Sequence, residues 1–190
     1  MNTNPPAPAE NSWYYSTYLA DYEPETHSSL SIIEIGEKAP EIDLIDLRTG
    51  SRKTLSDYRG RMVLLEFWIT NCGYCIEAVP ILNELAAQND ADALVILGVN
   101  TIDSENTVRS FMQRNKVTFD MLWGADANIN EGYGIDAFPQ VVLLDAAGVV
   151  SYSGRLDVQR IMAIQSRTAT RILRSSASWT TAWYSAIIYR

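Results

Sequence analysis

Cys72 and Cys75 stand at the start of an expected helix and are the only cysteines in the chain, with Gly73 and Tyr74 between them. They follow an apolar strand expected over residues 62–69. At the first turn of a helix, a sulfur lies beside backbone N–H groups without intrahelical partners and near the positive end of the macrodipole. Such surroundings can lower a thiol pKa from about 8.5 to roughly 7 or below. Because the thiolate is the attacking species in disulfide exchange, the pattern predicts a redox centre.

Zinc binding is the main competing use of a Cys-x-x-Cys pair, and the sequence disfavours it. Zinc sites normally use four protein ligands or three and a water, but there is no second cysteine pair, and His27 is the only histidine. We therefore expect no metal, and no cofactor besides a redox-active Cys72/Cys75 disulfide. No cysteine is left for a structural disulfide, so the fold has to be stable without one.

Size and charge limit the classes of function. With 190 residues, of which 47% are hydrophobic, the chain suits one domain with its own core. Its net charge of −8 argues against general nucleic-acid binding, which depends on lysine and arginine. We find no signal-peptide pattern and no segment near the roughly 20 apolar residues of a membrane span. We therefore expect a soluble chain without a targeting signal of its own.

The two ends differ in composition from the middle. Residues 1–35 are rich in proline and aromatic residues without a regular period, which predicts an irregular extension. Residues 155–190 hold six arginines against one acid, and this basic stretch ends in an aromatic tail, residues 175–190, in which Trp179, Trp183 and Ile187 recur at helical spacing. A membrane surface or a partner's groove would suit such a helix, but we favour a tail that packs on its own domain or is poorly ordered. The expected domain covers residues 36–174.

Hydrophobic patterning within this domain alternates between strands and helices. We expect strands over residues 42–47, 62–69, 93–99, 118–123, 140–145 and 149–153. Helices are expected over residues 72–88, 104–115, 128–133 and 156–173, with a short helical turn over 55–60. Alternating strands and helices, followed by a hairpin and a helix, predict a layered α/β fold with a mixed sheet.

The segment from Phe67 to Cys75, followed by Pro80 and by Phe138-Pro139 before an apolar strand, resembles the thioredoxin superfamily. A motif from Gly36 to Pro40, an Asp-rich hairpin and an inserted segment over residues 101–134 resemble its TlpA/ResA branch, which is of the AhpC/TSA type. The likeness covers about residues 36–165. It implies a thioredoxin-like three-layer α/β/α fold with a central mixed sheet, an N-terminal hairpin and an inserted α/β segment.

This resemblance implies a bacterial thiol-disulfide oxidoreductase in which Cys72 is the nucleophile and Cys75 the resolving thiol. The implied partners are proteins with thiols or disulfides and an unidentified protein that resets the redox state. We expect the enzyme to pass electrons to its partners and so to reduce their cysteines. The family is mostly extracytoplasmic, whereas the missing signal peptide leaves the cytoplasm as the alternative. The oligomeric state is open.

Glu66 interrupts the apolar strand, on the same face as Leu64 and Trp68 by strand alternation. Burial without a cation raises the pKa of a carboxyl, and an acid poised near neutrality could take the proton from Cys75. Glu66 is therefore the third expected catalytic residue. The alternative is a residue at the end of the sheet whose carboxylate reaches water.

The expected substrate-binding residues surround the motif. The resemblance implies a cis bond before Pro139 and a groove in which a substrate strand adds alongside Ala137 and Phe138. Phe138 is bulkier than the family's usual residue there, and Asn71 replaces a common tryptophan. The remaining expected contacts are Trp68, Asn71, Gly73 and Tyr74.

Three other functions stay open. Bacterial disulfide isomerases resembling DsbC have Gly-Tyr between their cysteines, so isomerase activity is one alternative. A thiol peroxidase is another, although the Pro-x-x-x-Thr-x-x-Cys pattern of peroxiredoxins is absent around Cys72. The third is a non-catalytic interaction module of the same fold, which binds a partner through an end of the chain.

Overall fold

The computed structural model describes residues 33–90, 92–125 and 127–168. The expected tail over residues 175–190 and nearly all of the expected extension over residues 1–35 lie outside this part. The limits of the expected domain therefore stay a prediction. Within the described part, every helix is too short or too polar to cross a lipid bilayer.

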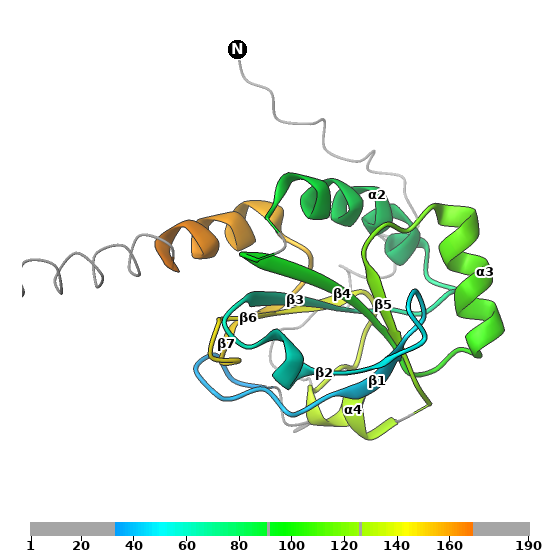
Figure 1. The fold of residues 1–190 in the computed structure, drawn as a ribbon, viewed down its shortest axis with the longest axis horizontal. Helices are drawn as coiled ribbons and strands as arrows, with labels where there is room; N and C mark the ends of the chain where they lie inside the picture. The colour runs from blue at the N-terminus through cyan, green and yellow to red at the C-terminus, as the bar shows by residue number, and fades with distance from the viewer. Residues whose placement is uncertain (1–32, 91, 126, 169–190) are drawn as a thin grey trace, which may run out of the picture. The chain divides into compact units, whose positions relative to one another are not determined.

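A seven-stranded mixed sheet forms the centre of the fold, in the order β2-β1-β5-β4-β3-β6-β7 (Figure 1). Its strands are β1 (Asp43–Asp46), β2 (Arg52–Thr54), β3 (Met62–Phe67), β4 (Leu94–Asn100), β5 (Asp120–Trp123), β6 (Gln140–Leu144) and β7 (Val150–Gly154). The central strand β3 pairs in parallel with β4 and antiparallel with β6. The expected mixed sheet and the hairpins β1–β2 and β6–β7 are confirmed.

Helices cover both faces of the sheet, as the expected three layers require (Figure 1). On one face lie α2 (Gly73–Gln88), α3 (Glu105–Asn115) and the helical residues 158–168, all of which contribute to one core cluster. The 3-10 helix η1 (Leu55–Tyr58) and α4 (Ala127–Gly132) contribute to a second cluster on the opposite face. The inserted segment supplies α3, β5 and α4, as expected.

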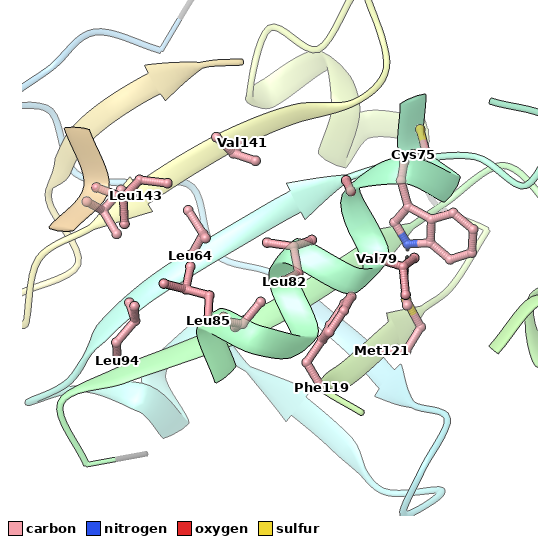
Figure 2. Packing of buried hydrophobic residues seen from close by; sticks show 14 of the residues in the cluster. Leu64, Cys75, Val79, Leu82, Leu85, Leu94, Phe119, Met121, Val141 and Leu143 are labelled. Carbon is pink, nitrogen blue, oxygen red and sulfur yellow. Dashed lines mark hydrogen bonds between the residues drawn. The ribbon is translucent and has the colours of Figure 1, made fainter. Parts of the chain in front are cut away.

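Strand β3 is buried on both faces because its residues are apolar at nearly every position. Leu64 points to the α2 side, whereas Leu65 points to the side of η1 and α4. On the α2 side, Val79, Leu82 and Leu85 of the helix pack with sheet residues such as Leu64, Val141 and Leu143 (Figure 2). This packing fixes α2, and with it the cysteine pair, over the centre of the sheet.

Most expected elements differ from the structure by one or two residues at their ends. The final helix begins at residue 158 and not at 156. The side chain of Asp157 accepts a hydrogen bond from the backbone N–H of Arg160 at 3.0 Å, so it caps the helix and fixes its start. Helix α3 begins after Ser104, whose hydroxyl accepts a hydrogen bond from the backbone N–H of Thr107 and caps the helix.

Candidate active site

Cys72 and Cys75 form a disulfide at the N-terminal end of α2, with their Cα atoms 5.2 Å apart. Cys72 is the N-cap residue, and its Sγ accepts a hydrogen bond from the backbone N–H of Cys75 at 3.1 Å. Cys72 is half-buried, whereas Cys75 is only 1% exposed and belongs to the core under the helix (Figure 2). One sulfur therefore sits at the surface in contact with a helix N-terminus, and the other lies beneath it.

The loop before β6 lies against the disulfide. The Phe138–Pro139 peptide bond is cis, which confirms the expectation for this position. The Sγ of Cys72 is 3.6 Å from the carbonyl oxygen of Phe138. Ala137, Phe138 and Pro139 are all half-buried. The fold thus brings together two segments that are 66 residues apart in the chain.

Glu66 lies in the interior of the sheet, paired with Gly98 of β4 and with Val141 of β6. It is 2% exposed, and its Oε1 has no hydrogen-bond partner among the described residues. Burial raises the pKa of Glu66 to about 8. The alternative of a carboxylate that reaches water at the end of the sheet is therefore wrong. Glu66 shares the α2 face of β3 with Leu64 and Trp68, as expected.

Trp68 lies beneath the loop that leads to the cysteines and is only 2% exposed. Its indole N–H contacts the Sδ of Met121 at 3.0 Å, and its ring centroid is 4.3 Å from that of Phe111. Trp68 is therefore packed in the core of this structure. Its expected contact with substrate stays a prediction. The other expected contacts lie around the sulfurs: Asn71 and Gly73 are exposed, and Tyr74 is half-buried.

A polar cluster that was not predicted from the sequence supports this loop. The carboxylate of Asp103 accepts hydrogen bonds from the backbone N–H and the hydroxyl of Thr70, at 2.8 and 3.0 Å. Asn100, which is 0% exposed, donates its Nδ2–H to the same carboxylate at 2.8 Å. The available signal was the pair of polar residues Asn100, at the end of a buried strand, and Asp103, three residues later. Within the described residues, no group of His, Cys, Asp and Glu side chains could hold a metal ion.

Comparison with known proteins agrees with this geometry. Residues 35–153 match the AhpC/TSA family, which is more than half of the chain. The chain belongs to this family. A relative from Geobacillus thermodenitrificans, "Thiol-disulfide oxidoreductase ResA", is 33% identical over 118 residues, which are 62% of this chain and 67% of the relative. "Thioredoxin-like protein YneN" from Bacillus subtilis is 33% identical over 130 residues, 66% of this chain and 75% of that protein.

Solved structures show the same fold for this AhpC/TSA family member. The thioredoxin domain of a thiol-disulfide oxidoreductase from Bacteroides vulgatus superposes with a TM-score of 0.61 at 27% identity, covering 65% of this chain and 90% of that one. The chain is thus a thioredoxin-like thiol-disulfide oxidoreductase with a redox disulfide between Cys72 and Cys75.

Proposed function

We propose that this enzyme uses its reduced cysteine pair to reduce disulfide bonds in other proteins. The observation that carries the proposal is the difference in exposure between the two cysteines: Cys72 is half-buried, whereas Cys75 is 1% exposed. A disulfide on another protein can therefore reach Cys72 and not Cys75. Cys72 is accordingly the attacking residue, and Cys75 the resolving one.

The reaction has two exchange steps. The Cys72 thiolate attacks one sulfur of the substrate disulfide, a new S–S bond joins Cys72 to the substrate, and the other substrate sulfur leaves as a thiolate that takes a proton from water. Cys75 then loses its proton and attacks the Sγ of Cys72, so the second substrate sulfur leaves. Two electrons pass to the substrate, and the enzyme is left with the Cys72–Cys75 disulfide. A second protein with a reducing dithiol has to restore it.

Glu66 is the proposed acceptor of the proton that Cys75 loses. By strand alternation it lies on the same face of β3 as Leu64, which packs in the core cluster under α2. Its Oε1 has no hydrogen-bond partner among the described residues. A pKa of about 8 leaves part of the population as carboxylate at neutral pH, and that carboxylate is a base of suitable strength. Unlike a solvent-exposed acid, it can accept a proton beneath the surface.

The buried surroundings of Cys75 favour reduction over oxidation of partners. A couple becomes strongly oxidising when its reduced thiolate form is stabilised. The buried polar and charged residues of the described part are Asp46, Glu66, Asn100 and Thr101, none of which is a cation. Cys75 is 1% exposed, and burial disfavours a charged form of a thiol. Stabilisation of a thiolate is thus limited to Cys72 at the start of α2, and we propose that the pair is a reductant and not a strong oxidant.

The surface around Cys72 suits a protein substrate. Ile76, in the first turn of α2, is 44% exposed, and Ile102, in the loop after β4, is 59% exposed. We propose that these apolar side chains contact the substrate together with Asn71, Gly73 and Tyr74. The backbone of Ala137 and Phe138 would pair with an extended substrate segment next to its cysteine.

The decisive experiment uses a pair of cysteine variants. Cys75→Ser should accumulate a mixed disulfide between Cys72 and a protein substrate, whereas Cys72→Ser should lose disulfide reduction. Full reductase activity in Cys72→Ser would contradict the assigned roles. Equilibration with glutathione or dithiothreitol should place the couple near the roughly −270 mV of thioredoxin. A potential near about −120 mV would mark an oxidant and contradict the proposed direction.

A further inference from the structure

The turn that leads into the cysteine pair is held by a side chain from the loop that follows the neighbouring strand β4. The backbone N–H of Trp68 still bonds to the carbonyl of Val99 in the manner of the β3–β4 ladder. Two residues later, the backbone N–H of Thr70 bonds to the carboxylate of Asp103 at 2.8 Å. The hydroxyl of Thr70 bonds to the other oxygen of that carboxylate at 3.0 Å. Asp103 thus supplies the hydrogen-bond acceptor for the backbone just beyond the end of the β3–β4 ladder.

Asp103 is itself fixed by three elements of the fold. Its backbone N–H donates to the side-chain oxygen of Asn100 at 2.9 Å, and its carboxylate accepts from the Nδ2–H of Asn100 at 2.8 Å. Its backbone carbonyl accepts from the indole N–H of Trp123, in β5, at 2.8 Å. The next residue, Ser104, caps α3. The carboxylate is therefore a rigid anchor and not a mobile surface group.

We propose that Asp103 is a positioning residue, which holds Thr70 and thereby sets the place of Cys72 at the start of α2. The proposal rests on the role of Cys72 as the attacking sulfur. Only Asn71 lies between Thr70 and Cys72, and Asn71 is exposed. Without the anchor, the Thr70–Asn71 turn loses two hydrogen bonds on the side facing β4. Cys72 can then leave the position in which its sulfur meets the N–H of Cys75.

Two substitutions of Asp103 distinguish the effect of its hydrogen bonds to Thr70 from the effect of its negative charge. Asp103→Ala removes both bonds to Thr70. Asp103→Asn keeps them, because one amide oxygen accepts from the Thr70 N–H while the amide NH2 donates to the Thr70 hydroxyl, which can also act as an acceptor. The asparagine variant therefore loses the charge but retains the anchor.

The experiment measures Cys72 directly in the reduced enzyme. We expect Asp103→Ala to slow alkylation of Cys72 at pH 7 several-fold and to shift the equilibrium of the cysteine pair with glutathione. It should also lower kcat/KM for a protein disulfide roughly tenfold or more, since small misplacements of a reacting group are costly. For Asp103→Asn, the alkylation rate, the glutathione equilibrium constant and kcat/KM should stay within about threefold of the parent values. Thr70→Val should change these quantities in the same direction as Asp103→Ala, whereas Thr70→Ser should leave them near the parent values.

Asp145→Ala is a matched control for a general loss of loop structure. Its carboxylate also holds a loop, through the backbone N–H groups of Ala147 and Val149 at 2.9 Å, but it lies after the far end of β6. We expect it to lower the melting temperature without changing the alkylation of Cys72 or the glutathione equilibrium. This comparison removes any effect that comes from stability alone.

Either of two results would overturn the proposal. Unchanged alkylation and glutathione equilibrium in a folded Asp103→Ala would show that Asp103 does not position Cys72. Equal losses in Asp103→Asn and Asp103→Ala would assign the effect to the charge. If Asp103→Ala does not fold, Thr70→Val compared with Thr70→Ser decides in the same way. Because alkylation and equilibrium need no substrate, failure of the parent enzyme to reduce proteins would count against the proposed function alone.

Discussion

Glu66 and Gly98 are direct partners in the parallel ladder between β3 and β4. The acid in the central strand therefore lies beside a residue that has no side chain. The space above Gly98 is filled by Met121, because a Cβ added at Gly98 would come within 2.5 Å of its Sδ. That sulfur in turn contacts the indole N–H of Trp68 at 3.0 Å. The sheet below α2 is thus packed closely around an acid that burial disfavours in its charged form.

The first prediction concerns stability and pH. In the folded protein the pKa of Glu66 is raised from its ordinary value of 4.5 to about 8. The folded state therefore holds a proton that the unfolded state has lost between these two values. Stability should fall as the pH rises through this window, by at most about 1.4 kcal/mol per pH unit. Urea unfolding at several pH values measures this.

Glu66→Gln should remove this slope because it cannot ionise, and Glu84→Gln should retain it because Glu84 is exposed on α2. A slope that is the same in the parent and in Glu66→Gln would show that Glu66 ionises normally in the folded state.

The second prediction concerns the proton that leaves Cys75. If Glu66 accepts it, the step that releases substrate from the mixed disulfide should speed up as the pH rises towards about 8 and then level off. Glu66→Gln should slow this step by roughly 100-fold near neutral pH, in keeping with the usual effect of losing a general base. Rapid-quench measurement of mixed-disulfide decay gives the rate. A parent-like pH profile in Glu66→Gln would remove Glu66 from the mechanism.

The third prediction concerns the space at Gly98. Gly98→Ala should destabilise the protein by about 1–3 kcal/mol, because its methyl group has to displace Met121 and Phe119 in a packed core. Gly73→Ala is the control, since a Cβ there meets no atom within 4 Å. It should change the free energy of unfolding by less than about 1 kcal/mol. Equal effects of the two substitutions on chemical unfolding would contradict the packing argument.

The fourth prediction concerns Phe138, whose carbonyl faces Cys72 and whose ring packs against both core clusters. Phe138→Ala should raise KM for a protein disulfide several-fold, while a small aromatic disulfide is reduced at nearly the parent rate. The reason is that a small substrate needs access to Cys72 but no groove. Ile81→Ala, which removes an exposed apolar side chain further along α2, should change neither value. Equal losses of activity on both substrates would show that Phe138 acts by holding the two cysteines in place and not by binding the substrate protein.

Much of the fold follows from local patterns in the sequence. The apolar run of β3 and the helical period of α2 are strong enough to predict a buried strand followed by a covering helix. The same patterns place Cys72 at the helix start, because the strand, the turn and the helix are consecutive. Glu66 stands out in the sequence for the same local reason: it is a charge in an apolar strand.

The tertiary structure decided what no local pattern contains. Whether Glu66 is buried or reaches water depends on its neighbours in β4 and β6, which come from distant parts of the chain. The bond between Asp103 and Thr70 joins residues 33 positions apart. Side-chain bonds of this kind depend on how strand ends meet, so hydrophobic periodicity does not reveal them. The sequence by itself determined where the cysteine pair and the buried acid lie along the chain, because both depend on local patterns, and the packing of the sheet decided which side chains from distant segments surround them.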